Sequence, residues 1–171
     1  MSKVFTFTPD YQYPVNGKEI IKGGTGYNYP SGGEKLSEEI EHIYPDYKLY
    51  PQFKNTAYGF LTRGCPRGGD FCIVKDKEGR KSVKVADLNE FWDGQKNIVL
   101  LDPNMFACKD WKDLSRQLIN SKAWVDFSQG CDIRIMGAEK AEYLKQIKVK
   151  QVHFAWDRYE DKNIIIPKFK E

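Results

Sequence analysis

Four apolar segments behind residue 55 alternate with helical patterns, and this alternation constrains the fold more than any other feature of the chain. The segments span residues 57–61, 97–102, 124–129 and 152–156, and the two steps between the last three starts are under thirty residues each. The run "NIVLLD" (97–102) is nearly all apolar, as strands buried within a parallel sheet are. The alternation therefore predicts an α/β fold with a parallel sheet and covering helices.

Helical spacing recurs between these segments. Residues 110–121 and 138–147 each place apolar side chains on one face, and residues 85–92 suit a shorter helix. The side chains expected to face the sheet are Trp111, Leu114, Leu118 and Ile119 in the first helix and Ala141, Leu144 and Ile147 in the second. Four strands are too few to close a barrel, so the sheet is expected to be a partial (β/α) barrel or an open sheet.

The front of the chain has a different character. Residues 4–8 suit a short strand, and residues 22–33 are loop-like because they are rich in Gly, Asn, Pro and Ser. Leu36, Ile40 and Ile43 recur at helical spacing before Pro45. We therefore divide the chain into a small glycine-rich segment, residues 1–50, and an α/β domain, residues 51–171.

Composition narrows the functional classes. The 171 residues carry 27 basic and 24 acidic side chains spread along the chain, whereas a nucleic-acid binder usually has a concentrated basic stripe. There is no signal-like start and no apolar window of about 18 residues, so a soluble, cytoplasmic protein without membrane association is expected. Four cysteines in such a chain are expected to stay reduced, as core, metal or redox thiols.

Polar side chains gather where the predicted strands end. In parallel sheets, ligands bind beyond the carboxyl ends of the strands, so these residues form a candidate site. They are Cys65, Cys72, Asp102, Asn104, Gln129, Asp132, Arg134 and Asp157.

The stretch "GFLTRGCPRGGDFCIV" (59–74) resembles the first strand and cluster loop of the radical S-adenosylmethionine (radical SAM) family, whose hallmark is C-x3-C-x2-C. Cys65 and Cys72 match the first and third cysteines, Phe71 matches the usual aromatic residue, and Gly69 stands at the middle position. "NIVLLDPN" and "VDFSQGCDIR" resemble the next two strands of one branch of the family. "GGTGY" and "HIYPDYKLY" resemble the end of the cobalamin-binding-like region that precedes the barrel in that branch.

The resemblance covers roughly residues 20–160, and family members are considerably longer at both ends. It implies a truncated or reduced member, in which residues 1–50 are a remnant of the cobalamin-binding-like region and residues 51–171 form a partial radical SAM barrel.

The resemblance also implies a function. Three thiolates would hold three irons of a [4Fe-4S] cluster, the fourth iron would bind S-adenosylmethionine, and an electron from a reductant protein such as a flavodoxin or ferredoxin would generate a 5′-deoxyadenosyl radical. With Gly69 in place of a cysteine, Cys65 and Cys72 are expected to hold the cluster weakly or partially, and enzyme activity is expected to be reduced or absent. Cys131 is an alternative third ligand, although a packed thiol is the simpler interpretation. Cys108 is expected to lie in the core.

The same resemblance assigns cofactor contacts to six residues. Phe71 would lie beside the adenine, and Arg134 would pair with the cofactor carboxylate, because a guanidinium matches that group bidentately. The alternatives are a core aromatic for Phe71 and an ion pair with Asp132 for Arg134.

For the remaining assigned residues, Gln129 and Asp132 would contact the ribose or the substrate, and Asp102 and Asn104 the methionine amino group. The alternatives are capping of strand ends for the first two and an ordinary turn for the "DPN" run that holds the others.

Two other functions remain open from the sequence. One is a non-catalytic remnant that interacts with another chain, which would complete the barrel. The other is a small zinc module that uses Cys65, Cys72 and one further residue, although no adjacent Cys/His pair has zinc-ligand spacing.

Overall fold

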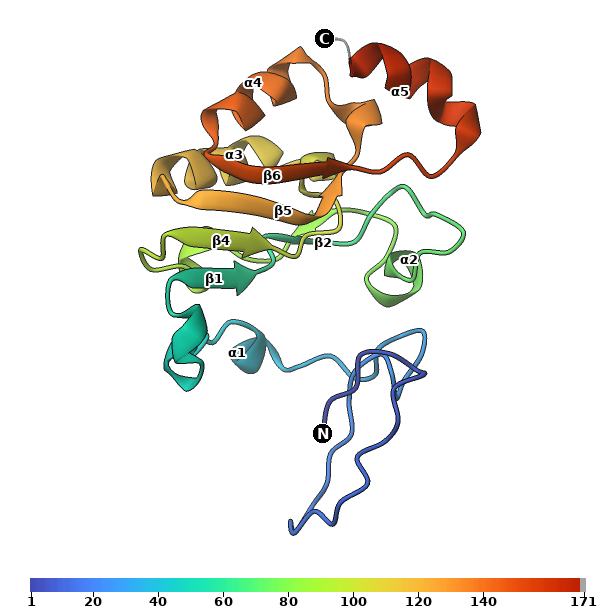
Figure 1. Cartoon of the computed structure of the whole chain (residues 1–171), viewed down its shortest axis with the longest axis vertical. Coiled ribbons are helices and arrows are strands. Elements are labelled where there is room, and N and C mark those ends of the chain that lie inside the picture. Colours follow the sequence, from blue (N-terminus) through green and yellow to red (C-terminus); the bar gives the residue numbers. More distant parts are fainter. Residues whose placement is uncertain (170–171) are drawn as a thin grey trace.

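A four-stranded parallel sheet forms the centre of the protein in a computed structural model, which describes residues 1–169 (Figure 1). Its order is β1 (Thr56–Gly59), β4 (Asn97–Leu100), β5 (Trp124–Cys131) and β6 (Val149–Phe154). All three neighbouring pairs are parallel. The expected α/β class with a parallel sheet is therefore confirmed.

Chain order and spatial order coincide in this sheet, since each new strand adds beside the previous one. Helix α3 (Trp111–Ser121) follows β4, α4 (Ala138–Gln146) follows β5, and α5 (Lys162–Lys168) follows β6. Because crossover connections share one hand, strands added in one direction place their helices on one face of the sheet. The opposite face, which is turned to the viewer in Figure 1, is covered by no helix of residues 1–169.

The core lies between the sheet and α3. Ile98, Leu100, Val125 and Phe127 alternate along β4 and β5 and are at most 3% exposed. Leu114 and Leu118 of α3 are fully buried against them, as expected from their spacing. Val99 and Asp126 point to the other face of the sheet and are half-buried. The apolar run at β4 is therefore fully covered on one face only.

Helix α4 differs in part from expectation. Leu144 and Ile147 face inward, but Ala141 is exposed. The helix contacts α3 through Tyr143, whose ring lies edge-on to Trp111 at 5.2 Å between centroids. The predicted inward position of Ala141 was therefore wrong.

A short hairpin that the sequence did not predict encloses the cysteine loop. Strands β2 (Thr62–Arg63) and β3 (Val83–Lys84) pair antiparallel, and residues 64–82 between them contain both cysteines and α2 (Val74–Lys77). Two-residue strands are too short to show an alternating pattern. The loop is therefore anchored at both ends rather than simply following β1.

The front segment is mostly loop. No strand forms at residues 4–8, and only one bridge joins Ser2 to Gly23. The predicted helix at 34–43 is reduced to α1 (Glu38–Glu41), and residues 85–92 contain only the 3-10 helix η3 (Leu88–Glu90). The front segment extends below β1 as a long arm in Figure 1.

Other 3-10 helices connect the main elements. They are η1 (Tyr47–Leu49), η2 (Pro51–Phe53), η4 (Met105–Ala107), η5 (Ile133–Ile135) and η6 (Tyr159–Asp161). Across residues 1–169, no helix is both long and apolar enough to cross a membrane.

Candidate functional site

A pocket of about 210 Å³ lies at the carboxyl ends of β4, β5 and β6, and the cysteine loop forms its outer wall. Its lining includes six of the eight residues that the sequence assigned to the site. These six are Cys65, Cys72, Asn104, Gln129, Asp132 and Asp157, and Phe71 lines the pocket beside them. The expectation that strand-end residues would converge is met for these six, and we call the space the cysteine pocket.

The Cys65 thiol is held by a buried amide. Asn104 Nδ2 lies 3.7 Å from Cys65 Sγ and donates to it, and the Cys65 backbone N–H donates to the Gly79 carbonyl at 3.2 Å. Asn104 is 2% exposed, and its Oδ1 atom has no partner among the described residues. A buried oxygen of this kind is costly unless a donor reaches it, so Asn104 is suited to accept a hydrogen bond from a ligand.

The middle position of the loop has room for a side chain. A Cβ atom added at Gly69 would meet only the Cβ of Cys72, at 3.6 Å, which is ordinary van der Waals contact. The backbone at Gly69 is outside the positive-φ region, unlike that at Gly64 and Gly68. Glycine is therefore not required at this position by the local conformation.

The buried cysteines differ from the loop cysteines. Cys131 lines the cysteine pocket but is 6% exposed, and burial, followed by the charges of Asp102 and Asp132, raises the pKa of its thiol to about 12. Cys131 is therefore a neutral thiol, which is a poor metal ligand in that state. Cys108 is 1% exposed and belongs to the core, as expected.

The arrangement of possible metal ligands in residues 1–169 also argues against a preassembled metal site. Within residues 1–169, no three His, Cys, Asp or Glu side chains are grouped so that they could hold a metal ion. The two loop thiols and Cys131 share a pocket without forming a preassembled three-thiolate set.

Asp102 lies behind the pocket wall rather than in its lining. Its carboxylate accepts hydrogen bonds from the backbone N–H groups of Leu61 at 3.1 Å and Thr62 at 2.6 Å, and from the Thr62 hydroxyl at 2.6 Å. Burial raises the pKa of this carboxyl from 3.8 to about 6, despite these donors. Asp102 thus joins the end of β4 to the chain after β1.

Arg134 also lies outside the lining, in a bidentate ion pair. Its Nε and Nη2 atoms lie 2.8 and 2.7 Å from the two carboxylate oxygens of Asp132. Burial raises the pKa of Asp132, but the hydrogen bonds and charge of Arg134 outweigh it and hold that pKa below 3.8. The ion-pair alternative for Arg134 is therefore formed.

The ion pair belongs to a larger network that the sequence did not predict. Arg134 Nη1 lies 3.3 Å from Asp161, and Arg67 Nη2 lies 3.7 Å from Asp161 and 3.0 Å from Asp157. The network joins the cysteine loop to the segment after β6. Arg67 stands in the "TRGCPRG" run, and that proximity to Cys65 was the only available signal.

Phe71 and Gln129 are the most exposed members of the site. Phe71 is 80% exposed, so the core alternative for this residue was wrong. Gln129 is also exposed, and among residues 1–169 its amide donates only to the neighbouring Ser128 hydroxyl, at 3.4 Å. His153 of β6 is exposed, because it alternates with Val152 and Phe154, which pack against the core.

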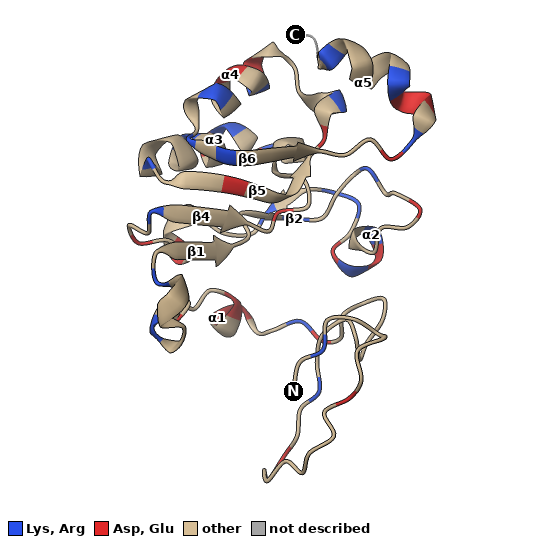
Figure 2. Cartoon of the chain, viewed as in Figure 1, with Lys and Arg blue, Asp and Glu red and all other residues tan. Residues whose placement is uncertain are grey.

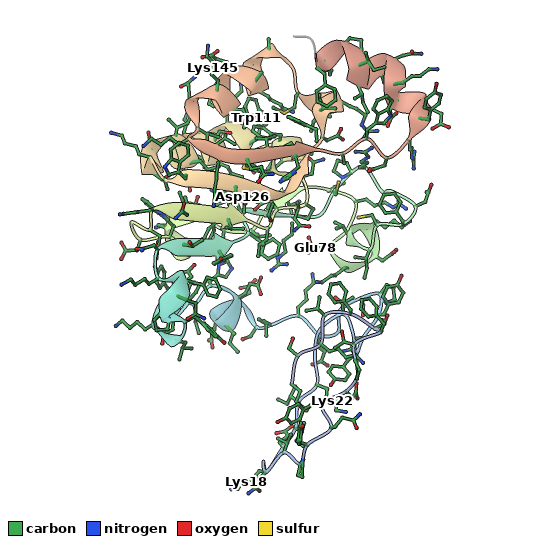
Figure 3. All side chains as sticks on the ribbon, in the orientation of Figure 1. Lys18, Lys22, Glu78, Trp111, Asp126 and Lys145 are labelled. Carbon is green, nitrogen blue, oxygen red and sulfur yellow. The ribbon has the colours of Figure 1, made fainter. Side chains whose placement is uncertain are left out.

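Glu78, labelled in Figure 3, fixes the base of the loop. Its carboxylate accepts from the Gly64 N–H at 3.1 Å and lies 3.4 Å from Arg63. Arg63 in turn pairs with Glu41 of the front segment at 2.8 Å. The cysteine loop is thereby connected to α1 as well as to the sheet.

Comparison with known proteins adds no identification. No protein-family model matches the chain, and no curated protein or solved structure is similar to it.

Proposed function

We propose that this chain is a reduced radical SAM-type protein that binds S-adenosylmethionine beside an incomplete iron–sulfur cluster. The observation that carries the proposal is the convergence of Cys65, Cys72 and Asn104 on one pocket at the carboxyl ends of the parallel strands. Strands added in chain order with one face free of helices are also what a segment of a (β/α) barrel requires. The finer assignment to a radical SAM barrel rests on the resemblance of residues 59–74.

The residues of the cysteine pocket fit the organic cofactor in part. The orphaned Asn104 Oδ1 can accept a hydrogen bond from the methionine ammonium, and exposed Phe71 offers a ring beside the pocket mouth. A pocket of about 210 Å³ is smaller than the roughly 300–1,000 Å³ of most small-molecule sites. The cofactor would therefore extend out of the pocket past Phe71.

The residues do not fit a complete cluster. Iron–sulfur clusters prefer thiolate ligands, and the loop provides two, at Cys65 and Cys72. The third thiol in the pocket, Cys131, would have to lose its proton to bind iron, and burial opposes this by raising the pKa of the thiol to about 12. We therefore assign binding to this pocket and assign no radical step to it.

Anaerobic reconstitution with iron and sulfide tests the proposal. We expect partial loading of the natural protein, loss of loading in a Cys65→Ser/Cys72→Ser double variant, and increased loading in Gly69→Cys. Gly137→Cys is the matched control, because a Cβ there meets nothing within 4 Å and the thiol lies outside the cysteine pocket. Equal iron and sulfide content in all four proteins would overturn the proposal.

Release of 5′-deoxyadenosine under reducing conditions is the second measurement. We expect little or none from the natural protein and more from Gly69→Cys. Isothermal titration with S-adenosylmethionine before and after reconstitution separates cofactor binding from cluster assembly.

The open face of the sheet favours a second candidate, a non-catalytic module that binds another chain. β1 and β6 are the edge strands of the four-stranded sheet, and Tyr58 of β1 is 37% exposed. Unpaired sheet edges are templates for association. This candidate predicts a colourless protein that self-associates as its concentration rises in analytical ultracentrifugation, whereas a monomer at all concentrations that loads iron would exclude it.

A further inference from the structure

A second and larger hollow, of about 520 Å³, lies beside the two ends of the cysteine loop. It is formed where β3 and the end of the cysteine loop meet the segment between η4 and α3. Pro66 contributes to this hollow, whereas its neighbours Cys65 and Arg67 line the cysteine pocket. The two spaces are therefore separate, and we call the second one the basic pocket.

Cationic side chains dominate its lining. The lining holds one carboxylate, that of Asp110, and four cationic residues, Arg80, Lys81, Lys84 and Lys109. Lys84 is already neutralised, because its Nζ atom pairs with Asp87 and with Asp113. Arg80, Lys81 and Lys109 form no ion pair with any residue in 1–169.

Three cations without an ion-pair partner outnumber the single carboxylate of Asp110 and make the lining net positive, and like charges gathered at a concave surface reinforce one another. Arg80 lines the basic pocket, and its guanidinium reaches Gly68 of the cysteine pocket, where an added Cβ would meet the Nη1 atom at 2.6 Å. A guanidinium matches a phosphate group bidentately, and a lysine ammonium acts beside it as a point charge. The charges therefore select an anionic ligand.

The size and walls of the basic pocket narrow the ligand class. About 520 Å³ is within the usual range for small organic ligands and is far more than one phosphate needs. Pro66, Val83 and Ala107 provide an apolar wall beside the cations. The lining thus combines surfaces for phosphate groups and for an organic moiety.

Charge over the rest of the chain argues against a nucleic-acid strand as the ligand. In Figure 2, basic and acidic segments alternate over the helices and loops. A strand would need phosphate contacts at regular intervals along a groove.

We propose that the basic pocket binds a phosphate-bearing small molecule of nucleotide size through Arg80, Lys81 and Lys109. The site does not depend on the cluster or on S-adenosylmethionine. It therefore stands even if the proposed function fails.

Isothermal titration of the full chain tests this site with four probes: ATP, inorganic pyrophosphate, adenosine and a 12-nucleotide single-stranded DNA. We expect ATP to bind with one-to-one stoichiometry, pyrophosphate to bind more weakly, and adenosine not to bind. ATP affinity should fall as salt rises, because exposed charges are screened.

Two double variants of equal charge identify the site. Arg80→Gln/Lys109→Gln should weaken ATP binding at least about tenfold, since it removes two charge-assisted contacts to the phosphates. Lys18→Gln/Lys145→Gln removes the same charge from the arm and from α4, where Figure 3 labels both lysines, and should leave ATP affinity unchanged. All four side chains are at the surface, so circular dichroism should show both variants folded.

Three results would overturn the proposal. They are no ATP binding at millimolar concentration, equal loss in the two double variants, and binding of the DNA more tightly than ATP with loss in the Arg80/Lys109 variant.

Discussion

Gly69 and Cys72 face each other across one turn of the cysteine loop. The Cys72 N–H donates to the Gly69 carbonyl at 3.1 Å, and a Cβ atom at Gly69 would lie 3.6 Å from the Cys72 Cβ. The loop therefore retains a geometry in which two side chains at these positions project side by side. A cysteine placed at position 69 would therefore lie close enough to Cys72 to react with it, and this reaction would not require any cofactor.

We predict that Gly69→Cys forms an intramolecular disulfide with Cys72 under mild oxidation. The Cβ–Cβ separation of 3.6 Å lies within the roughly 3.5–4.5 Å that disulfides span. Mass spectrometry of the oxidised variant should show the loss of two hydrogens and a crosslinked peptide that joins positions 69 and 72. Gly137→Cys should remain reduced under the same conditions, and equal oxidation of the two variants would contradict the loop geometry.

Asp102 should make stability decrease as pH rises. Its folded pKa is about 6 against an ordinary 3.8, so the unfolded chain ionises first and the folded state loses stability between these values. Below pH 3.8 the stabilisation by the neutral carboxyl is fully present, and by pH 7 up to about 3 kcal/mol of it is lost.

Urea unfolding of the natural protein and of Asp102→Asn from pH 4 to pH 7 measures this effect. As pH rises, the unfolding free energy of the natural protein should fall relative to that of Asp102→Asn. Asp93→Asn, which removes an exposed carboxylate, should show no such trend. A flat difference for Asp102→Asn would show that its carboxyl titrates normally.

The Arg134–Asp132 pair should stabilise the fold at neutral pH and lose this effect in acid, which is the opposite of the pH dependence expected for Asp102. Asp132 is 7% exposed, so Arg134→Gln leaves a buried carboxylate with its main partner removed and should cost about 2 kcal/mol, less than for a fully buried pair because Arg134 is partly exposed. Arg134→Lys keeps the charge but not the two parallel hydrogen bonds and should cost about half as much.

The pH dependence separates this pair from general loss of packing. The pKa of Asp132 is held below 3.8, so the stabilisation is present above that pH and is lost as pH falls through the folded pKa. The difference between natural protein and Arg134→Gln in chemical unfolding should therefore shrink in acid. A difference that is constant with pH would assign the loss to packing of the arginine stem.

The sheet could be predicted from the sequence because its signals are local. The apolar runs at β4 and β5 and the helical face of α3 are repeated within a few residues, and burial of one face fixes them. The hairpin of β2 and β3 could not be predicted, since two residues per strand show no periodicity and the pairing joins positions about twenty residues apart.

The candidate site was predictable to the extent that it follows topology. Strand-end residues such as Asn104 and Gln129 reach the cysteine pocket because parallel strands end at one edge. Asp102 and Arg134 instead bind other residues of the protein. Asp102 accepts a hydrogen bond from Thr62 and Arg134 pairs with Asp161, and neither contact can be read from the sequence. Arg67 enters the site for the same reason, through Asp157.

The apolar residues at helical spacing in the front segment are exposed, whereas Leu114 and Leu118 of α3 are buried, and this contrast gives a matched test. Leu118 of α3 is fully buried, whereas Leu36 is 61% exposed although both stand at apolar positions of a helical pattern. Leu118→Ala should cost roughly 2–5 kcal/mol through lost burial and the cavity it leaves, and Leu36→Ala should cost less than about 0.5 kcal/mol. Urea unfolding monitored by tryptophan fluorescence measures both. A loss above about 1 kcal/mol for Leu36→Ala would show that residues 34–43 pack against the domain in solution, and the same result would weaken the assignment of this segment to loop.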